Sequence, residues 1–178
     1  MLGNSLIRHG KWDSLLSRKD VINRGISGDR LKCICERLSY LDGYNPKICF
    51  IEGGINDLPG SNPDSLFEDY KQIVSYFKKR KIIPIINLVL FINPRAGLKW
   101  DIRKNYISIN KQVAYLDERL IVYSSSEHIT YIDLNKKLCH DNVLMDKYTT
   151  DGVHLTSEGY RIWSDEIKNI LKKYNIRR

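Results

Sequence analysis

The feature that most constrains the fold is an alternation of short apolar runs with longer segments of helical periodicity along the whole chain. Strands are predicted over residues 20–23, 47–51, 82–91 and 129–134. Helical spacing of apolar residues predicts helices over 29–41, 63–80, 101–119 and 156–174. Parallel strands need crossover connections, so this order favours a mostly parallel sheet with helices on both faces.

The length of 178 residues favours one domain spanning 1–178. The first polar motif begins at Gly3, so only a stub of a first strand precedes it and that strand is expected to be truncated. The longest apolar run, 82–92, is shorter than the roughly 18 residues expected of a membrane span. No secretory signal pattern is present, although loss of an upstream segment would also remove one.

The chain has four cysteines, and their positions show no metal-ligand spacing; they are Cys33, Cys35, Cys49 and Cys139. Cys33 and Cys35 fall two residues apart on a predicted helix, where their side chains diverge, so a disulfide between them is not expected. A reduced protein located in the cytoplasm is the preferred interpretation.

Three short polar clusters, far apart in the sequence, follow predicted strands or lie in the last loop. They are Gly3-Asn4-Ser5, Gly54-Ile55-Asn56-Asp57 and Asp151-Gly152-Val153-His154. In open parallel sheets ligands bind beyond the carboxyl ends of the strands. We therefore expect these clusters to converge at one edge of the sheet.

The clusters contain the three side chains of a hydrolytic triad, in the chain order Ser, Asp, His. A serine hydroxyl needs an adjacent base to act as a nucleophile at neutral pH, and that base needs an orienting partner. Ser5 is the candidate nucleophile and His154 the candidate base. Asp151, three residues before His154, can reach its Nδ1 from the same loop.

Four blocks of the chain, in order, resemble the SGNH (GDSL-type) hydrolase superfamily of esterases and acylhydrolases. The blocks are Gly3-Asn4-Ser5-Leu6, Asn23-Arg24-Gly25-Ile26-Ser27-Gly28, Gly54-Ile55-Asn56-Asp57 and Asp151-Gly152-Val153-His154-Leu155. The resemblance covers essentially the whole chain. It implies a three-layer α/β/α sandwich with a mostly parallel five-stranded sheet, flavodoxin-like in appearance.

The resemblance also implies a mechanism that needs no metal and no organic cofactor. Ser5 would attack an ester carbonyl, and the oxyanion would receive the backbone N–H groups of Ser5 and Gly25 and the side-chain amide of Asn56. The sequence departs from the family pattern at Asn4, where the usual residue is Asp, and at Leu6-Ile7-Arg8, where small or hydroxylated residues often follow the serine. These departures leave the catalytic groups in place and bear on substrate choice.

The substrate expected from the resemblance is a short-chain acyl ester, most simply an acetyl ester, of a carbohydrate or lipid. A long apolar lid segment, which would suit long acyl chains, is absent from the sequence. Two residues are candidate substrate contacts: Arg8, just after the nucleophile, and Trp100, as a wall of the pocket. His9, His128 and His140 have no partner pattern and are assigned to the surface or to packing, although His9 could line the pocket.

Each site residue also has a purely structural interpretation. Ser5 could cap a helix, Asp151-Gly152 is a common turn dipeptide, and Asn56 could cap a loop. Gly25 could be a turn glycine with positive φ. The four blocks together favour the catalytic interpretation over these separate ones.

The net charge of +8 supports one alternative, a non-catalytic module on the same fold that binds an anionic glycan or nucleic acid. The basic residues are dispersed, however, and the two dense runs, 78–81 and 172–178, fall at predicted helix C-termini, where cations complement the helix dipole. No specific nucleic-acid partner is therefore expected. The sequence makes no prediction of oligomeric state.

Overall fold

The computed structural model describes residues 1–58, 60–96 and 106–176, and its centre is a five-stranded sheet in the order β2-β1-β3-β4-β5. The strands are β1 (Leu2–Gly3), β2 (Arg24–Gly25), β3 (Ile48–Ile51), β4 (Ile83–Asn87) and β5 (Thr130–Ile132). Every neighbouring pair in this sheet is parallel. This is the flavodoxin-like strand order, and it confirms the predicted fold class.

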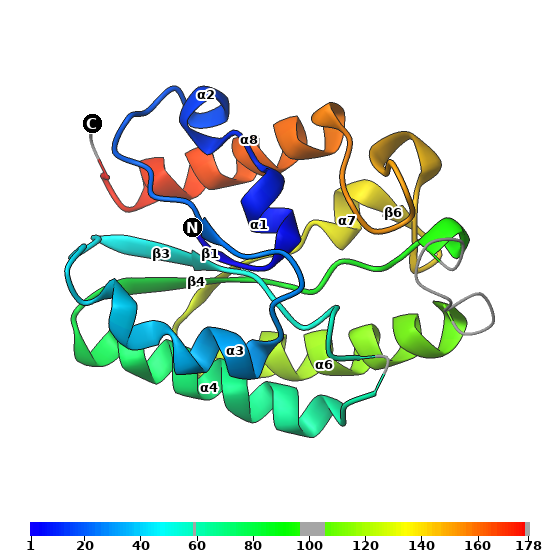
Figure 1. The fold of residues 1–178 in the computed structure, drawn as a ribbon, viewed down its shortest axis with the longest axis horizontal. Coiled ribbons are helices and arrows are strands. Elements are labelled where there is room, and N and C mark those ends of the chain that lie inside the picture. The colour runs from blue at the N-terminus through cyan, green and yellow to red at the C-terminus, as the bar shows by residue number, and fades with distance from the viewer. Residues whose placement is uncertain (59, 97–105, 177–178) are drawn as a thin grey trace.

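Helices cover the sheet on both faces and form the two outer layers (Figure 1). One face carries α1 (Ser5–His9), α2 (Trp12–Leu16) and α8 (Ser157–Lys173). The other carries α3 (Leu31–Glu36), α4 (Pro63–Lys79) and α6 (Tyr106–Ser126). No helix in the described ranges has both the length and the apolar character that crossing a membrane requires.

Shorter elements complete the connections. They are the 3₁₀ helices η1 (Leu38–Leu41), η2 (Pro94–Ala96) and η3 (Asp146–Tyr148), the helix α7 (Asn135–Leu138), and a hairpin of β6 (Cys139–His140) and β7 (Val143–Leu144). The hairpin and η3 lie in the long connection between β5 and α8, which also carries the last polar cluster.

A separate hydrophobic core forms on each face of the sheet, because strands buried on both sides are apolar throughout. Across the second core, α8 is tied to the sheet by the Trp163 indole, which is 1% exposed and donates to Asn87 Oδ1 at 2.8 Å. The Asn87 amide in turn donates to the Ile51 carbonyl at 2.9 Å. These two hydrogen bonds link α8 to β4 and β4 to β3 at the last residues of the two strands.

The predicted strand over 82–91 ends earlier in the structure, at Asn87, and the reason is visible in its hydrogen bonds. Beyond this point the backbone N–H groups of Val89, Phe91 and Ile92 donate to side-chain oxygens and not to a neighbouring strand. The acceptors are Asp117, Asn135 and Asn110. The Leu88 N–H still donates to Ile132 of β5, and from Val89 onward the apolar run continues as buried chain outside the sheet.

Other boundaries also differ from the prediction. The second strand lies at Arg24–Gly25, after the predicted 20–23, and the predicted helix 29–41 divides into α3 and η1. The helices α1 and α2 were not predicted. Each has five residues, which is too short for a helical period to show.

We expect Trp163→Phe to lower the free energy of unfolding by about 2 kcal/mol, because it leaves the buried Asn87 oxygen without its donor and opens a small cavity. Urea unfolding followed by circular dichroism measures this. Tyr174→Phe is the matched control, since it removes a half-buried hydroxyl that bonds Thr130 Oγ1, and it should cost less than about 1 kcal/mol. Equal losses in both variants would contradict the assignment.

Candidate active site

Ser5 stands where β1, an inner strand of the sheet, turns into α1. Asn4 caps this helix, with its side-chain oxygen accepting the Leu6 N–H at 2.8 Å. Ser5 is the first helical residue, so its own N–H has no partner within the helix. The residue is 5% exposed. A turn of this kind places the hydroxyl and a backbone donor side by side at the carboxyl end of the strand.

The loop after β7 and η3 brings His154 to Ser5 from a position 149 residues further along the chain. His154 Nε2 lies 2.9 Å from Ser5 Oγ, and His154 Nδ1 lies 2.7 Å from Asp151 Oδ2. A carboxylate can only accept, so we assign the ring proton to Nδ1, and Nε2 accepts from the serine hydroxyl. The three predicted triad residues thus form one hydrogen-bonded chain.

The loop that holds Asp151 and His154 is closed by its own hydrogen bonds. Asp151 Oδ1 accepts the backbone N–H groups of Val153 and His154 at 3.1 and 2.9 Å. Thr149 Oγ1 donates to the His154 carbonyl at 2.9 Å and accepts the Gly152 N–H at 2.8 Å. The carboxylate is therefore both an orienting partner for the imidazole and the centre of its own turn.

These hydrogen bonds determine the charge of Asp151. Burial alone would raise its pKa, but the bonds from the His154 ring and from the His154 and Val153 N–H groups outweigh burial and hold the pKa well below its usual range. Asp151 is therefore ionised throughout the pH range in which an imidazole base is neutral. An ionised partner stabilises the imidazolium that forms when a base takes a proton.

Asn56 follows β3 in the turn that begins at Gly54. Its side-chain amide donates one hydrogen to the Asp29 carbonyl at 2.9 Å, which ties this turn to the loop between β2 and α3. An Asn amide has two hydrogens, so one is left to point elsewhere. Next to it, the Asp57 carboxylate accepts the Leu31 N–H at 3.2 Å and anchors the start of α3.

Gly25 does not take the role predicted for it. Its N–H donates to Asn23 Oδ1 at 2.9 Å, so it is already occupied. Gly25 lies within β2, and a Cβ there would come within 2.2 Å of the Arg8 backbone nitrogen. The glycine is required because α1 packs directly onto β2, and its predicted contribution to an oxyanion hole is corrected here.

Gly28, three residues on, has the geometry that Gly25 lacks. The Asp29 N–H donates to the Ile26 carbonyl at 3.2 Å, and Gly28 has φ +84°, which together define a type II turn. The Gly28 N–H lies outside the hydrogen bond that closes this turn. The same turn carries the Asp29 carbonyl that holds Asn56, so Gly28 belongs to the loop beside the predicted donor side chain. Within the predicted block, Gly28 is therefore a candidate donor, since the Gly25 N–H is already paired.

Of the two predicted substrate contacts, Arg8 is exposed on α1, three residues after Ser5. Trp100 lies outside the residues that the structure describes. His9 is assigned from the sequence to the surface or to packing, or to the lining of the pocket. In the structure its ring centroid lies 5.1 Å from that of His154. His9 is four residues after Ser5, which places both on one side of a helix, but this relation is visible only once α1 is known.

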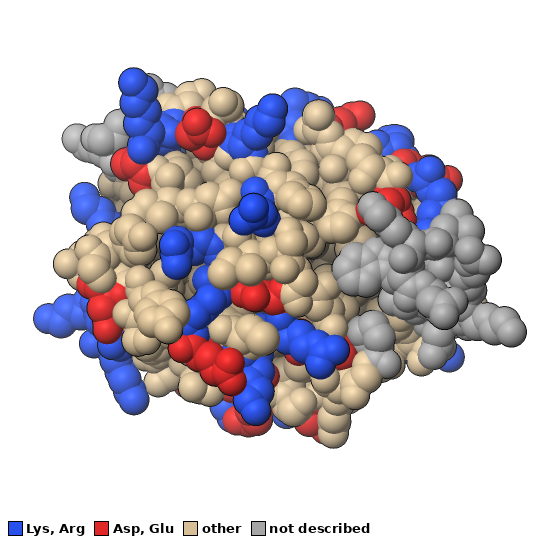
Figure 2. All heavy atoms as spheres, viewed as in Figure 1, with Lys and Arg blue, Asp and Glu red and all other residues tan. Residues whose placement is uncertain are grey.

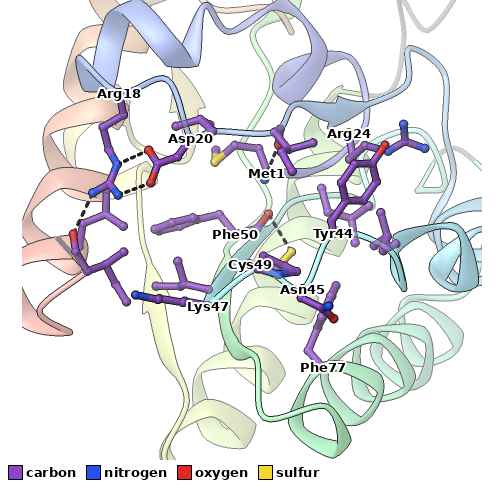
Figure 3. A pocket seen from close by; sticks show the side chains of 18 of the residues that line it. Met1, Arg18, Asp20, Arg24, Tyr44, Asn45, Lys47, Cys49, Phe50 and Phe77 are labelled. Carbon is purple, nitrogen blue, oxygen red and sulfur yellow. Dashed lines mark hydrogen bonds and ion pairs between the residues drawn. The ribbon is translucent and has the colours of Figure 1, made fainter. Parts of the chain in front are cut away.

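A cavity of about 290 Å³ lies at the other end of the sheet, away from the triad (Figure 3). Its lining includes Met1, Lys47 and Ile48 at the starts of β1 and β3, together with Phe50 and Phe77. Ser5 follows the opposite, carboxyl end of β1, and Asn56 lies in the turn after the carboxyl end of β3. This cavity is therefore separate from the hydrolytic site.

Over the described ranges, His, Cys, Asp and Glu side chains form no group of three or more arranged to hold a metal ion. The triad and the donor groups around it are side-chain and backbone groups of the chain itself. Ser5, His154 and Asp151 each lie within hydrogen-bonding distance of the next residue in this order.

The chain is similar to proteins described as ester hydrolases. The GDSL-like lipase/acylhydrolase family matches residues 3–162. An isoamyl acetate-hydrolyzing esterase of Saccharomyces cerevisiae is 26% identical over 177 residues, covering 88% of this chain and 71% of the esterase. A GDSL-like lipase from Bacteroides thetaiotaomicron has a crystal structure that superposes with a TM-score of 0.85 at 26% identity, over 97% of this chain and 86% of that one.

A third relative is similar along only part of its length. An N-acylneuraminate cytidylyltransferase of Streptococcus agalactiae is 22% identical over 163 residues, which cover 87% of this chain and 37% of that protein. The family match spans nearly the whole chain, and it agrees with the sheet order and with the geometry around Ser5. The chain belongs to the GDSL-like lipase/acylhydrolase family and is a carboxylic ester hydrolase.

Proposed function

We propose that residues 1–178 form one serine esterase domain that hydrolyses a short-chain acyl ester, most simply an acetyl ester, of a carbohydrate or lipid. The observation that carries this proposal is the hydrogen-bonded chain from Ser5 Oγ through the His154 ring to Asp151, with distances of 2.9 and 2.7 Å. Such a chain activates a serine for nucleophilic attack.

In the first half of the reaction, Ser5 Oγ attacks the ester carbonyl carbon while His154 Nε2 takes the hydroxyl proton. The carbonyl becomes a tetrahedral oxyanion, and His154 then gives its proton to the departing alcohol oxygen. In the second half, water attacks the acyl-serine, His154 takes a proton from the water, and the acid leaves as Ser5 regains its proton. The products are an alcohol and a carboxylic acid, and Ser5 is restored.

Three donors are available for the oxyanion. The Ser5 N–H is unpaired within α1, Asn56 has a second amide hydrogen, and the Gly28 N–H replaces that of Gly25 in the proposal. The hydrogen bond from Asn56 to Asp29 holds two of these donors in one unit, because Asp29 follows Gly28 directly. Donors fixed before the reaction stabilise developing charge without reorganisation.

The short acyl group and the cytoplasmic location are part of the proposal. The yeast relative is named for hydrolysis of an acetate ester, and this chain offers no long apolar segment in its sequence for a lipase lid. All four cysteines are free thiols, in keeping with a reducing compartment.

The alternative, a non-catalytic module for an anionic glycan or nucleic acid, would not need a serine, an imidazole and a carboxylate in one hydrogen-bonded chain. The face of the molecule in Figure 2 shows Lys and Arg side chains interspersed with Asp and Glu, without a continuous basic stripe. A backbone-tracking nucleic-acid site needs clustered positive charge. The esterase proposal therefore accounts for more of the structure.

Hydrolysis of p-nitrophenyl acetate, butyrate and octanoate tests this function, with Ser5→Ala and the exposed Ser14→Ala as a matched pair. We expect turnover that falls as the acyl chain lengthens, is unchanged in Ser14→Ala, and is lost by at least about 10⁴-fold in Ser5→Ala, because the nucleophile is gone. A fluorophosphonate probe should label the wild type and leave Ser5→Ala unlabelled. Folded wild type with neither turnover nor labelling would exclude the proposal.

We expect Asp151→Asn to reduce kcat by about 10²–10⁴-fold, because an amide no longer stabilises the imidazolium or selects the Nδ1-protonated tautomer. The measurement is kcat for p-nitrophenyl acetate at pH 7.5, beside the exposed Asp13→Asn as control. Activity within a few-fold of the wild type in a folded Asp151→Asn variant would assign another residue to this role.

Asn56→Ala should lower kcat by about 10²–10³-fold with little change in KM, because the amide acts on charge that exists only in the transition state. Asn62→Ala serves as the control. It removes the cap of α4, whose Oδ1 accepts the Asp64 N–H at 2.9 Å, and should lower stability by about 1 kcal/mol while leaving kcat unchanged. A rise in KM at constant kcat would place Asn56 in ground-state binding.

A further inference from the structure

Glu52 is a buried carboxyl group beside the nucleophile turn. It follows β3, and its backbone N–H donates to the Leu2 carbonyl at 2.9 Å, so β1 and β3 together fix its place. The residue is 2% exposed. Its second carboxylate oxygen, Oε2, lies against Gly3, where an added Cβ would come within 3.1 Å of it, and this oxygen has no hydrogen-bond partner among the described residues. The mechanism above does not use this group.

Asn4 connects this carboxyl group to the helix that carries Ser5. Its Nδ2 donates to Glu52 Oε1 at 3.1 Å, and its Oδ1 accepts the Leu6 N–H at 2.8 Å. Because one end of the amide must accept and the other must donate, both ends are used and the orientation of the side chain is settled. Asn4 is fully buried, at 0% exposure.

The other polar groups near Glu52 make their hydrogen bonds elsewhere, although Arg37 Nη1, like Glu52 Oε2, has no hydrogen-bond partner among the described residues. The hydroxyls of Tyr70 on α4 and Tyr160 on α8 donate to the carbonyls of Gly53 and Leu6, at 2.8 and 2.7 Å. Arg37, across Gly3, donates to the Gly3 carbonyl at 3.1 Å and forms an ion pair with Asp29 at 2.7 Å. Among the described residues, the side-chain amide of Asn4 is therefore the donor that holds the Glu52 carboxyl group.

We propose that Glu52 is a positioning residue for Ser5 and that Asn4 and Glu52 act as a matched pair. The carboxyl group of this pair lies on the residue after β3, and the side chain at position 4 is an amide. The Glu52 carboxyl group then requires a hydrogen-bond donor at position 4, which the Asn4 amide supplies. Asn4 is therefore not a weakened substitute for the usual motif residue. This inference rests on the proposed role of Ser5 as nucleophile, because it concerns how that residue is held.

The pair can hold one carboxyl group and not two. Burial raises the pKa of Glu52 to about 7 against the lowering effect of the Asn4 hydrogen bonds, so this site already resists a single negative charge. An aspartate at position 4 would place a second carboxyl oxygen about 3.1 Å from Glu52 Oε1, with its donor lost. Two such carboxyl groups would have to share a proton, and they would repel once it left.

The test is a cycle of four proteins: wild type, Asn4→Asp, Glu52→Gln and the double variant. Asn4→Asp restores the usual motif residue, yet we expect kcat for p-nitrophenyl acetate at pH 8 to fall at least tenfold. In the double variant, the new amide on β3 can donate to the new carboxylate at position 4, which still caps Leu6, so kcat should return to within about threefold of the wild type. Glu52→Gln alone should stay within about tenfold, because its amide oxygen still accepts from Asn4. A tenfold change in kcat corresponds to about 1.4 kcal/mol in activation free energy.

Two readouts separate positioning from general stability. The loss in Asn4→Asp, taken relative to the wild type at the same pH, should shrink at pH 5.5, where the shared proton is retained. Exposed residues give the controls: Asn62→Asp makes the same change at another helix cap, and Glu118→Gln removes an exposed carboxylate on α6. Both should leave kcat unchanged.

The proposal is overturned if Asn4→Asp keeps wild-type kcat at pH 8, or if Glu52→Gln fails to rescue it. Should Asn4→Asp not fold, a folded and active double variant supports the pair and an unfolded one overturns it. Wild type without turnover or phosphonate labelling would instead contradict the proposed function. In that case, the urea-unfolding midpoints of the same four proteins still measure the coupling between the two residues.

Discussion

The rest of the site depends on the contact between His154 Nε2 and Ser5 Oγ, which joins residues 149 positions apart. Ser5 is fixed because β1 is the inner strand between β2 and β3, so both of its edges are paired although it has only two residues. His154 is fixed by the turn around Asp151. The contact between Ser5 and His154 thus joins two local structures, each held by its own hydrogen bonds, and the packing of α8 on the sheet brings them together.

Beyond the end of β4, polar side chains accept the hydrogen bonds of buried backbone N–H groups. Past β4, the N–H groups of the buried chain are satisfied by Asp117, Asn110 and Asn135. Burial raises the pKa of Asp117 well above its usual range, although the bond from the Val89 N–H opposes this. A continuous strand would have satisfied the same groups through a neighbour, but it would also have covered the edge where the site opens. Buried backbone groups must find partners, and here side chains supply them.

Chemistry was easier to predict from the sequence than local geometry. The structure joins Ser5, Asp151 and His154 as their chemical types suggested, and the parallel order of strands followed from the alternation of elements. The choice between Gly25 and Gly28 could not be made in this way, because both are glycines in one block and only the three-dimensional partners of their N–H groups differ. The sequence named His9 only as a residue that could line the pocket, and its contact with His154 could not be predicted, since α1 is too short to leave a period in the sequence.

The side chain of a motif residue can make several hydrogen bonds, and its neighbours in space decide which residue type can make all of them. At position 4, one role is to accept the Leu6 N–H, and both Asn and Asp can fill it. The other role depends on what β3 presents: a carboxyl group there demands a donor, and Asn supplies one. The Asn at position 4, which looks like the loss of a charge when this position is considered alone, matches the carboxyl group of Glu52 when both positions are considered together. The strength of a motif match therefore depends on residues that the motif does not contain.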